Sequence, residues 1–389
     1  MNSVDFAETV KWATPKGLKL HPNMEHKCVN GIYGVYATAD IPQYTLLVSY
    51  PIKGTVPLLK NFSYPQNCPE LLKRLHASTL EYSKGESSEW RGLMNSVERL
   101  EELKKSSAYF LSKEELSTIQ KMNPLLHRII EEKNSIIDRQ VDNLCKIDPS
   151  LDKSSAKVIA LNFKTRAWQQ GFLPIFDQFN TSEAYGAKVC QNEKNIYFIS
   201  MKPYKMGEEI WISYGTRDIY DYAIDYDFFD PNAVHSICFA ARGSQFAQSQ
   251  FDVNVIKYTA TKHRMDISKT PQGLHYQLME DDARFLEHAP TSKLINYIQH
   301  TAFRSAQELQ QGICSPQSFD IRLNQILDAL ISMNNVDHFK EEQMPPRLLR
   351  FFHLLKKEKK ILINNKVWAR FNSLYVNEIP LEVQNKIMK

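Results

Sequence analysis

The order of β-rich and helix-rich stretches along the chain restricts its fold more than any other feature. Residues 20–65 and 161–235 hold short runs of β-branched and aromatic residues that end at turn residues, which predicts strands. Residues 66–160 are rich in Glu, Lys and Leu and poor in glycine and proline, which predicts helices. Residues 236–389, and above all 274–360, are also expected to be helical. We therefore predict an α+β fold: a β-core split by a helical insert, then an α-helical C-terminal domain.

Local signals mark where two of the helices should begin. Ser112 is followed three residues later by Glu115, the spacing of a capping box. Ser315 precedes Pro316 and a stripe of Leu and Ile at helical spacing. Both serines are therefore expected to cap helices.

Charge and hydropathy exclude several classes of protein. The 48 basic and 44 acidic side chains leave a net charge of +4 over 389 residues, whereas a dedicated nucleic-acid binder usually carries a concentrated basic stripe. The sequence has no apolar run long enough for a membrane-spanning helix. We expect a monomer that binds neither nucleic acid nor membrane.

The cysteines and histidines bear on metal binding and on the cellular compartment. The six cysteines are far apart and form no Cys-x-x-Cys pair, which argues against a disulfide framework or a four-cysteine zinc site. Free thiols and an N-terminus without an apolar core predict a cytoplasmic protein; export into another cell by a route without a cleaved signal stays open. His21, His26 and Cys28 form one candidate metal group, but no fourth ligand follows at a recognisable spacing. A polar loop is favoured there, and no metal is expected.

Three segments, in this order, resemble one family. They are GIYGVYATADIPQYTLLVSYP at 31–51, RAWQQGFLPIFDQFNTS at 166–182, and YFISMKPYKMGEEIWISYGTRDIYDYAIDYDFF at 197–229. They are similar to the G-x-G, L-P-x-x-D-x-x-N-H-S and G-E-x-I-x-I-x-Y-G-x-R motifs of SET-domain methyltransferases of the Rubisco large-subunit lysine methyltransferase type. That group includes the actin-histidine methyltransferase, with which residues 214–229 align without a gap. The strong resemblance covers about 90 residues.

The resemblance implies a fold and an activity. It implies a SET β-core with a pseudo-knot, a helical insert and a helical C-terminal domain of the substrate-binding type. It also implies an S-adenosylmethionine-dependent N-methyltransferase that releases S-adenosylhomocysteine and acts on a lysine of a folded protein substrate, with histidine as the second choice of acceptor. Methyl transfer is an in-line displacement, so the enzyme has to align donor and acceptor and exclude water.

The resemblance also implies roles for single residues. Tyr214 matches the catalytic tyrosine; the alternative is a core aromatic at the end of a strand. The residues expected to bind the cofactor are Gly31, Ile32, Tyr33, Arg166, Asp177, Asn180, Thr181, Tyr226 and Phe228. Arg166 would hold the cofactor's carboxylate, and Asn180 its adenosine. Trp168, Phe176 and Arg217 would line the substrate cleft, although the two aromatics fit a plain core equally well.

The chain departs from the family pattern at several positions. Asn180-Thr181 stands where the family has Asn-His, and Tyr226-Asp227-Phe228 where it has Tyr-Gly-Phe. Gly31-Ile32-Tyr33-Gly34 stands in place of its G-x-G. These departures motivate an alternative from another class, a degenerate SET module that binds a protein partner without catalysis.

Overall fold

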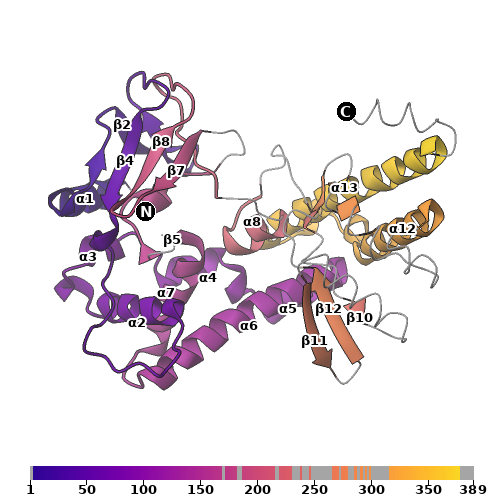
Figure 1. Ribbon diagram of the computed structural model, residues 1–389, viewed down its shortest axis with the longest axis horizontal. Coiled ribbons are helices and arrows are strands. Elements are labelled where there is room, and N and C mark those ends of the chain that lie inside the picture. Colours follow the sequence, from indigo (N-terminus) through magenta and orange to yellow (C-terminus); the bar gives the residue numbers. More distant parts are fainter. Residues whose placement is uncertain are drawn as a thin grey trace. The chain divides into compact units, whose positions relative to one another are not determined.

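The computed structural model describes residues 3–168, 171–181, 186–214, 219–229, 237–238, 245–246, 265–270, 273–278, 284–286, 290–291, 294–295, 298 and 315–376. The chain divides into two compact units (Figure 1). The first comprises Met1–Phe110 and Ile130–Gly215, and the second comprises Leu111–Ile129 and Thr216–Lys389.

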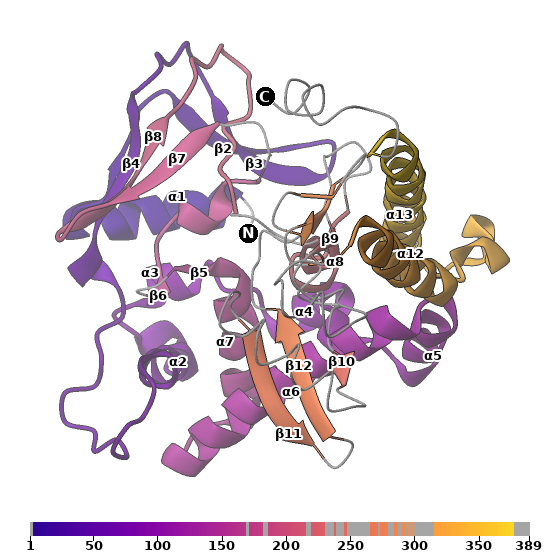
Figure 2. The ribbon, with the colours of Figure 1, turned by 45° about the vertical axis from the view of Figure 1, so that its right-hand side comes forward.

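The described residues of the first unit form three small antiparallel sheets. Four strands pair in the order β1-β4-β8-β7, and Figure 2 shows β4, β8 and β7 side by side. Their bounds are Lys19–Leu20 (β1), Leu46–Pro51 (β4), Asn195–Ser200 (β8) and Ala187–Gln191 (β7). The other two sheets are β2 (Met24–Val29) with β3 (Ile32–Ala37), and β5 (Ala167–Trp168) with β6 (Gly171–Phe172). Strands β3 and β4 thus confirm the prediction of strands within residues 20–65.

The turn between β2 and β3 follows from its two residues. Asn30 and Gly31 both have positive φ, at 52° and 83°, between the paired residues Val29 and Ile32. Asn-Gly is the preferred dipeptide of a two-residue hairpin because both positions require left-handed backbone. This turn fixes the register of β3, which carries Tyr33 and Gly34.

The segment of residues 209–212 is held by hydrogen bonds to separate parts of the first unit. Ile210 N–H donates to Val35 O at 2.8 Å, and Ile212 N–H donates to Asn180 O at 2.9 Å. Ala187 N–H donates to Trp211 O at 2.7 Å. This segment lies in the range 161–235, for which the sequence predicts ordinary strands. The structure differs because the bonds alternate between partners, so that no continuous ladder forms with one strand.

Residues 172–180 also differ from the prediction. The segment FLPIFDQFN, 172–180, lies in the range predicted to hold strands, but β6 ends at Phe172 and a 3-10 helix, Phe176–Gln178, follows. Pro174 has no N–H to give to a ladder, and Ile175 has a φ of +74°, which a strand does not allow. The chain therefore turns before it reaches Phe179 and Asn180.

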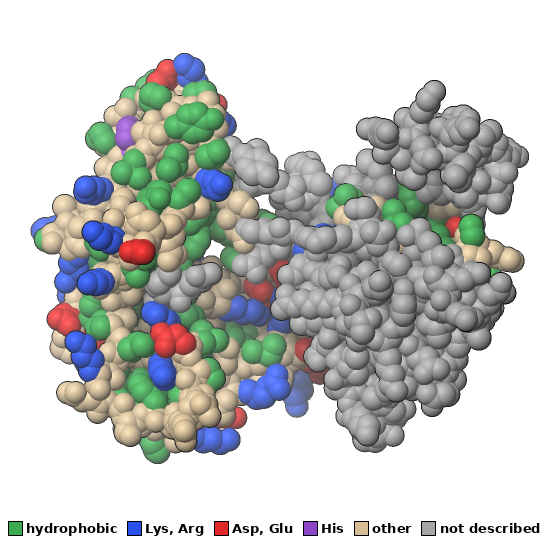
Figure 3. Space-filling view, viewed as in Figure 1, with side chains coloured by type: hydrophobic (Ala, Val, Ile, Leu, Met, Phe, Trp, Pro, Cys, Tyr) green, Lys and Arg blue, Asp and Glu red, His purple; other side chains and the backbone are tan. Residues whose placement is uncertain are grey.

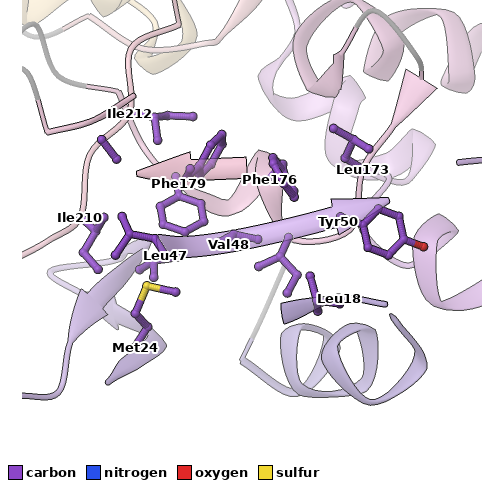
Figure 4. Packing of buried hydrophobic residues seen from close by; sticks show 14 of the residues in the cluster. Leu18, Met24, Leu47, Val48, Tyr50, Leu173, Phe176, Phe179, Ile210 and Ile212 are labelled. Carbon is purple, nitrogen blue, oxygen red and sulfur yellow. The ribbon is translucent and has the colours of Figure 1, made fainter. Parts of the chain in front are cut away.

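Side chains from several of these segments form the apolar core of the first unit (Figure 4). Val48 from β4 and Phe198 from β8 are completely buried, and so are Phe176 and Phe179. Leu18 and Met24 close the core from the N-terminal side, and Ile210 and Ile212 from the later segment. Segments more than 150 residues apart in sequence thus share one apolar cluster.

A run of helices separates the two β-rich parts, from Glu70 to Arg166. The helices are α2 (Glu70–Ser83), α3 (Arg91–Met94), α4 (Leu100–Ser106), α5 (Lys113–Met122), α6 (Pro124–Ile147) and α7 (Lys153–Arg166). A second apolar cluster, which includes Leu75, Leu93 and Ile159, packs the part that belongs to the first unit. Ser112 caps α5 in the predicted capping box with Glu115.

Three further α-helices are described in the second unit. They are α8 (Ile219–Asp225), α12 (Pro316–Met333) and α13 (Pro346–Val376), and Figures 1 and 2 both show α12 beside α13. Ser315 caps α12, as predicted. The same unit holds strands β9 (Ile237–Cys238), β10 (Gln245–Phe246), β11 (Met265–Thr270), β12 (Gly273–Leu278) and β13 (Arg284–Phe285). The expectation of helices over 236–389 is therefore wrong at these five strands.

In the part of the chain that the structure describes, no helix has the length and apolar character needed to cross a membrane.

Candidate functional site

The segment of residues 179–181 holds Tyr214 at two points. The Tyr214 hydroxyl donates to Phe179 O at 2.9 Å, and Tyr214 N–H donates to Thr181 Oγ1 at 3.2 Å. The ring is partly buried and packs against the core. Both the backbone and the hydroxyl of the predicted catalytic residue are therefore fixed.

Asn180 connects this segment to β3 and to Glu209. Its Nδ2 donates to Tyr33 O at 2.8 Å and to Glu209 Oε1 at 2.7 Å. Its backbone oxygen accepts from Ile212 N–H at 2.9 Å. The structure thus brings together Tyr33, Asn180, Thr181 and Tyr214, which come from three separate sequence segments.

Gly34 makes room for the Asn180–Glu209 pair. A Cβ atom on residue 34 would clash with Glu209 Oε1 and would lie 2.9 Å from Asn180 Nδ2. The φ of Gly34 is not among the positive values, so this glycine is required for space and not for backbone conformation.

The substitution Gly34→Ala is expected to destabilise the first unit by about 1–3 kcal/mol, the cost of overpacking. The added methyl group displaces the Glu209 carboxylate and the Asn180 amide, which are both fixed by hydrogen bonds. Thermal unfolding of the variant beside wild type measures the loss. An unchanged melting temperature would mean that the pair moves aside freely.

Glu209 is a partly buried carboxyl group. Burial raises the pKa of Glu209, and hydrogen bonds from Asn180 and Tyr36 oppose that rise. Burial, followed by the charge of Glu209, also raises the pKa of the Tyr36 hydroxyl. The backbone of Glu209 forms an antiparallel bridge with Tyr36, which places both side chains on the face of β3 that carries Gly34.

The remaining predicted residues of β3 lie near the hairpin tip. Ile32 is 63% exposed and Tyr33 is 41% exposed. Figure 3 shows hydrophobic side chains on the surface of the first unit among polar ones. Exposed apolar side chains beside a fixed backbone carbonyl suit contact with a ligand, but their role as cofactor residues stays a prediction, as does that of Gly31.

His26 stacks between two aromatic rings. Its ring lies 4.8 Å from that of Phe6 and 5.4 Å from that of Tyr33, nearly parallel to both. Burial lowers the pKa of His26 to about 4, so the imidazole is neutral at pH 7. Among the described residues no group of three or more His, Cys, Asp or Glu side chains is arranged to hold a metal ion.

We expect the stability of the first unit to fall as the pH drops from about 6.5 to about 4. The unfolded imidazole titrates near pH 6.5, and the folded one titrates near 4, so only the unfolded state takes up the proton in that window. The loss should reach at most about 3 kcal/mol, since one pKa unit corresponds to about 1.4 kcal/mol. Urea unfolding at several pH values measures it, and His26→Phe, which keeps the stack, should show a weaker pH dependence. Equal pH dependence in both proteins would contradict this expectation.

Arg166 lies in an ion pair with two acidic residues. Its guanidinium donates to Glu98 Oε1 at 2.5 Å and to Asp177 Oδ2 at 3.1 Å. Burial by itself would lower the pKa of Arg166, but the charges of Asp177 and Glu98 outweigh it and raise that pKa. These bonds use two of five N–H donors, so a further bond to a cofactor carboxylate stays a prediction. The same holds for Asp177, whose side chain is 3% exposed.

Trp168 and Phe176 belong to an aromatic cluster around Phe198. Trp168 is partly buried and lies 6.3 Å from the ring of Phe176, edge to face. Phe176 is completely buried and lies 4.6 Å from Phe198. Phe176 is thus a core aromatic in this structure. A contact of either ring with an acceptor side chain stays a prediction.

Tyr226 and Phe228 lie in the second unit, just after α8. Both rings lie near Tyr222, at 6.1 Å and 5.4 Å. Between them Asp227 has a φ of +60°, a conformation that favours the glycine of the family pattern. Asp227 forms an ion pair with Arg350 of α13. Arg217, the third predicted substrate residue, lies outside the described residues.

Comparison with known proteins identifies the β-core. Residues 32–215 match the family model described as the SET domain. The chain contains a SET domain. The resemblance drawn from the three sequence segments is therefore confirmed, and with it the predicted fold class.

Solved structures share the fold of this chain over nearly its whole length. The SET domain of LSMT bound to lysine and AdoHcy has a TM-score of 0.65 at 14% identity, with 96% of this chain and 92% of that chain covered. Rubisco LSMT bound to sinefungin and monomethyllysine gives 0.62 at 12% identity, with 97% and 94% covered. Rubisco LSMT bound to AdoMet gives 0.61 at 13%, with 95% and 92% covered. None of the curated protein sequences compared with this chain matches it significantly.

Sequence reasoning missed Glu209, Gly34 and Glu98 as neighbours of the site. Glu209 stands at a variable position of the G-E-x-I motif, and only its pairing with Tyr36 places it over Gly34. No local sequence pattern indicates that Glu98 pairs with Arg166, because the two residues lie 68 positions apart.

Proposed function

We propose that this chain is an S-adenosylmethionine-dependent protein N-methyltransferase that acts on a lysine side chain of a folded protein. The observation that carries the proposal is Tyr214, whose hydroxyl is fixed on Phe179 O beside Asn180 and Tyr33 within a SET domain. Structural neighbours of the same fold bind AdoMet, AdoHcy or methylated lysine, which supports the choice of cofactor and of acceptor.

The chemistry of the site residues fits such a cofactor. The polar atoms around residues 179–181 are mostly oxygen acceptors: the carbonyls of Tyr33 and Phe179 and the Glu209 carboxylate. Acceptors suit a ligand that carries a sulfonium and an ammonium group. Bound S-adenosylmethionine would supply a methyl group that an amine can attack without acid catalysis.

The residues of this chain would orient the reactants. Thr181 and Phe179 hold Tyr214 so that its oxygen can accept a weak hydrogen bond from the methyl group or the acceptor amine. The acceptor nitrogen must be neutral to attack, and an apolar channel favours the neutral amine through desolvation. The partly buried Trp168 is available for such a wall.

Two alternative functions are each supported by an observation. The gapless match of residues 214–229 to the histidine-methylating branch favours histidine as the acceptor. The Asn180-Thr181 departure favours a module that binds a protein without catalysis. In the structure Thr181 holds the backbone of Tyr214, which gives the threonine a use in an active enzyme.

The proposal is tested with labelled S-adenosylmethionine and whole-cell lysates. We expect a labelled protein whose acid hydrolysate contains methyl-lysine; methylhistidine would establish the alternative acceptor. Labelling should be absent with a Tyr214→Phe enzyme. Binding of S-adenosylmethionine without transfer to any protein would favour the non-catalytic module.

We also propose that the protein acts as a monomer in the cytoplasm. Cys28, Cys68, Cys145 and Cys190 form no disulfide in the structure, which suits a reducing compartment. Light scattering and cell fractionation test these two statements.

A further inference from the structure

The carboxylate of Glu209 is close to the cofactor residues but is not one of them. It lies over Gly34, accepts from Asn180 Nδ2 at 2.7 Å, and is also hydrogen-bonded to Tyr36. The backbone on both sides of it is fixed to β3: Ala37 N–H donates to Glu208 O at 2.9 Å, and Ile210 N–H donates to Val35 O at 2.8 Å. Glu209 therefore cannot move away without opening these bridges.

Glu209 and Tyr33 O together determine which way the Asn180 amide faces. Nδ2 carries two hydrogens, and both are used, one on Tyr33 O and one on Glu209 Oε1. If the amide were rotated by 180°, its oxygen would face both a carbonyl and a carboxylate, and no hydrogen would lie between them. The amide oxygen must therefore point away from β3 and Glu209, with its lone pairs available.

We propose that Glu209 is a positioning residue that orients the Asn180 amide, so that Asn180 Oδ1 serves as the acceptor for a hydrogen-bond donor of S-adenosylmethionine. The inference rests on the proposed function. The donor belongs to the class of amine or hydroxyl groups, which S-adenosylmethionine carries on its amino-acid, ribose and adenine parts. Glu209 itself need not touch the cofactor.

The test compares Glu209→Gln with Glu208→Gln. Glutamine keeps the size of the side chain but can turn its own NH₂ toward Asn180, which removes one of the two acceptors that oppose the rotated amide and leaves only Tyr33 O. Glu208 is the matched control, because it is an exposed neighbour that accepts from Lys205 N–H and is not bonded to Asn180. Calorimetric titration with S-adenosylmethionine gives the dissociation constant, and steady-state kinetics separates kcat from KM.

We expect Glu209→Gln to weaken S-adenosylmethionine binding by about 3- to 10-fold, the range for one net hydrogen bond. KM for the cofactor should rise, kcat at saturation should change less than about twofold, and Glu208→Gln should match wild type. In an Asn180→Ala background, Glu209→Gln should have no further effect, because the carboxylate acts through the amide. Equal affinity of the Glu209→Gln and wild-type proteins, or the same loss in the Asn180→Ala background, would overturn the inference.

A second measurement is independent of the cofactor. In protein labelled with ¹⁵N-asparagine, the two Asn180 amide hydrogens should be well separated in chemical shift and slow to exchange. Glu209→Gln should change both properties, and Glu208→Gln should not. Unaltered signals in Glu209→Gln would contradict the positioning role. If wild type does not bind S-adenosylmethionine, the proposed function fails, whereas the amide signals still decide whether Glu209 orients Asn180.

Discussion

The substitution Tyr214→Phe is expected to lower the rate of methyl transfer at saturating cofactor by at least about 100-fold, at the lower end of the range for a positioned catalytic group. The phenylalanine keeps the ring that packs against the core but removes the oxygen that Phe179 O holds at 2.9 Å. An interaction made mainly in the transition state changes kcat more than ground-state binding. The dissociation constant of S-adenosylmethionine should therefore stay within about threefold of wild type.

Tyr50→Phe is the matched control for that experiment. Tyr50 belongs to the same core and donates to a backbone carbonyl, Gly54 O, at 2.8 Å. Both variants lose one such hydrogen bond, which should cost about 1 kcal/mol of stability each. Only Tyr214→Phe should lose transfer. Full turnover in the Tyr214→Phe enzyme, or an equal loss in Tyr50→Phe, would refute the catalytic role.

The second large effect is expected for Arg166→Ala. The substitution leaves Asp177 without its cationic partner at a site where its side chain is 3% exposed, and it also breaks the bond to Glu98. Removal of one partner of a buried ion pair typically costs about 3–5 kcal/mol, because the remaining charge stays buried. Urea unfolding should show a loss of this size, whereas Arg139→Ala, at an exposed arginine of α6, should change stability by less than about 0.5 kcal/mol.

Arg166→Lys separates the structural role from the predicted cofactor contact. Lysine keeps the charge but not the fork that reaches two acidic groups at once. If Arg166 only stabilises the fold, the folded lysine variant should bind S-adenosylmethionine as wild type does. Weaker binding by the folded variant would support the contact with the cofactor carboxylate that the resemblance implies. A stability of Arg166→Ala equal to that of wild type would contradict the ion-pair role.

Features set by neighbouring residues could be predicted from the sequence. The caps at Ser112 and Ser315 were predictable because the side chain and the N–H that it accepts lie three residues apart. The strands β3 and β4 were predictable because short β-branched runs end at clear turn signals. The hairpin signal at Asn30-Gly31 was equally local, although it was not part of the prediction.

Features set by long-range pairing could not be predicted in this way. The segment 209–212 looks like a strand, but its hydrogen bonds go to β3, Asn180 and Ala187, and only the tertiary fold determines that. The pair Arg166–Glu98 likewise depends on how α7 meets the start of α4. At β11 and β12, two six-residue runs separated by two residues are a hairpin signal that the expectation of a helical tail passed over.

Direct titration of the purified chain with S-adenosylmethionine tests the central claim most directly. A calorimeter should record saturable binding of one molecule per chain, with lower affinity in Asn180→Ala and an affinity close to that of wild type in Tyr214→Phe. Binding of this kind would support a cofactor site in the SET domain, around Asn180 and Tyr33. No heat of binding at millimolar cofactor, with a protein shown to be folded by its thermal unfolding, would contradict the proposed methyltransferase.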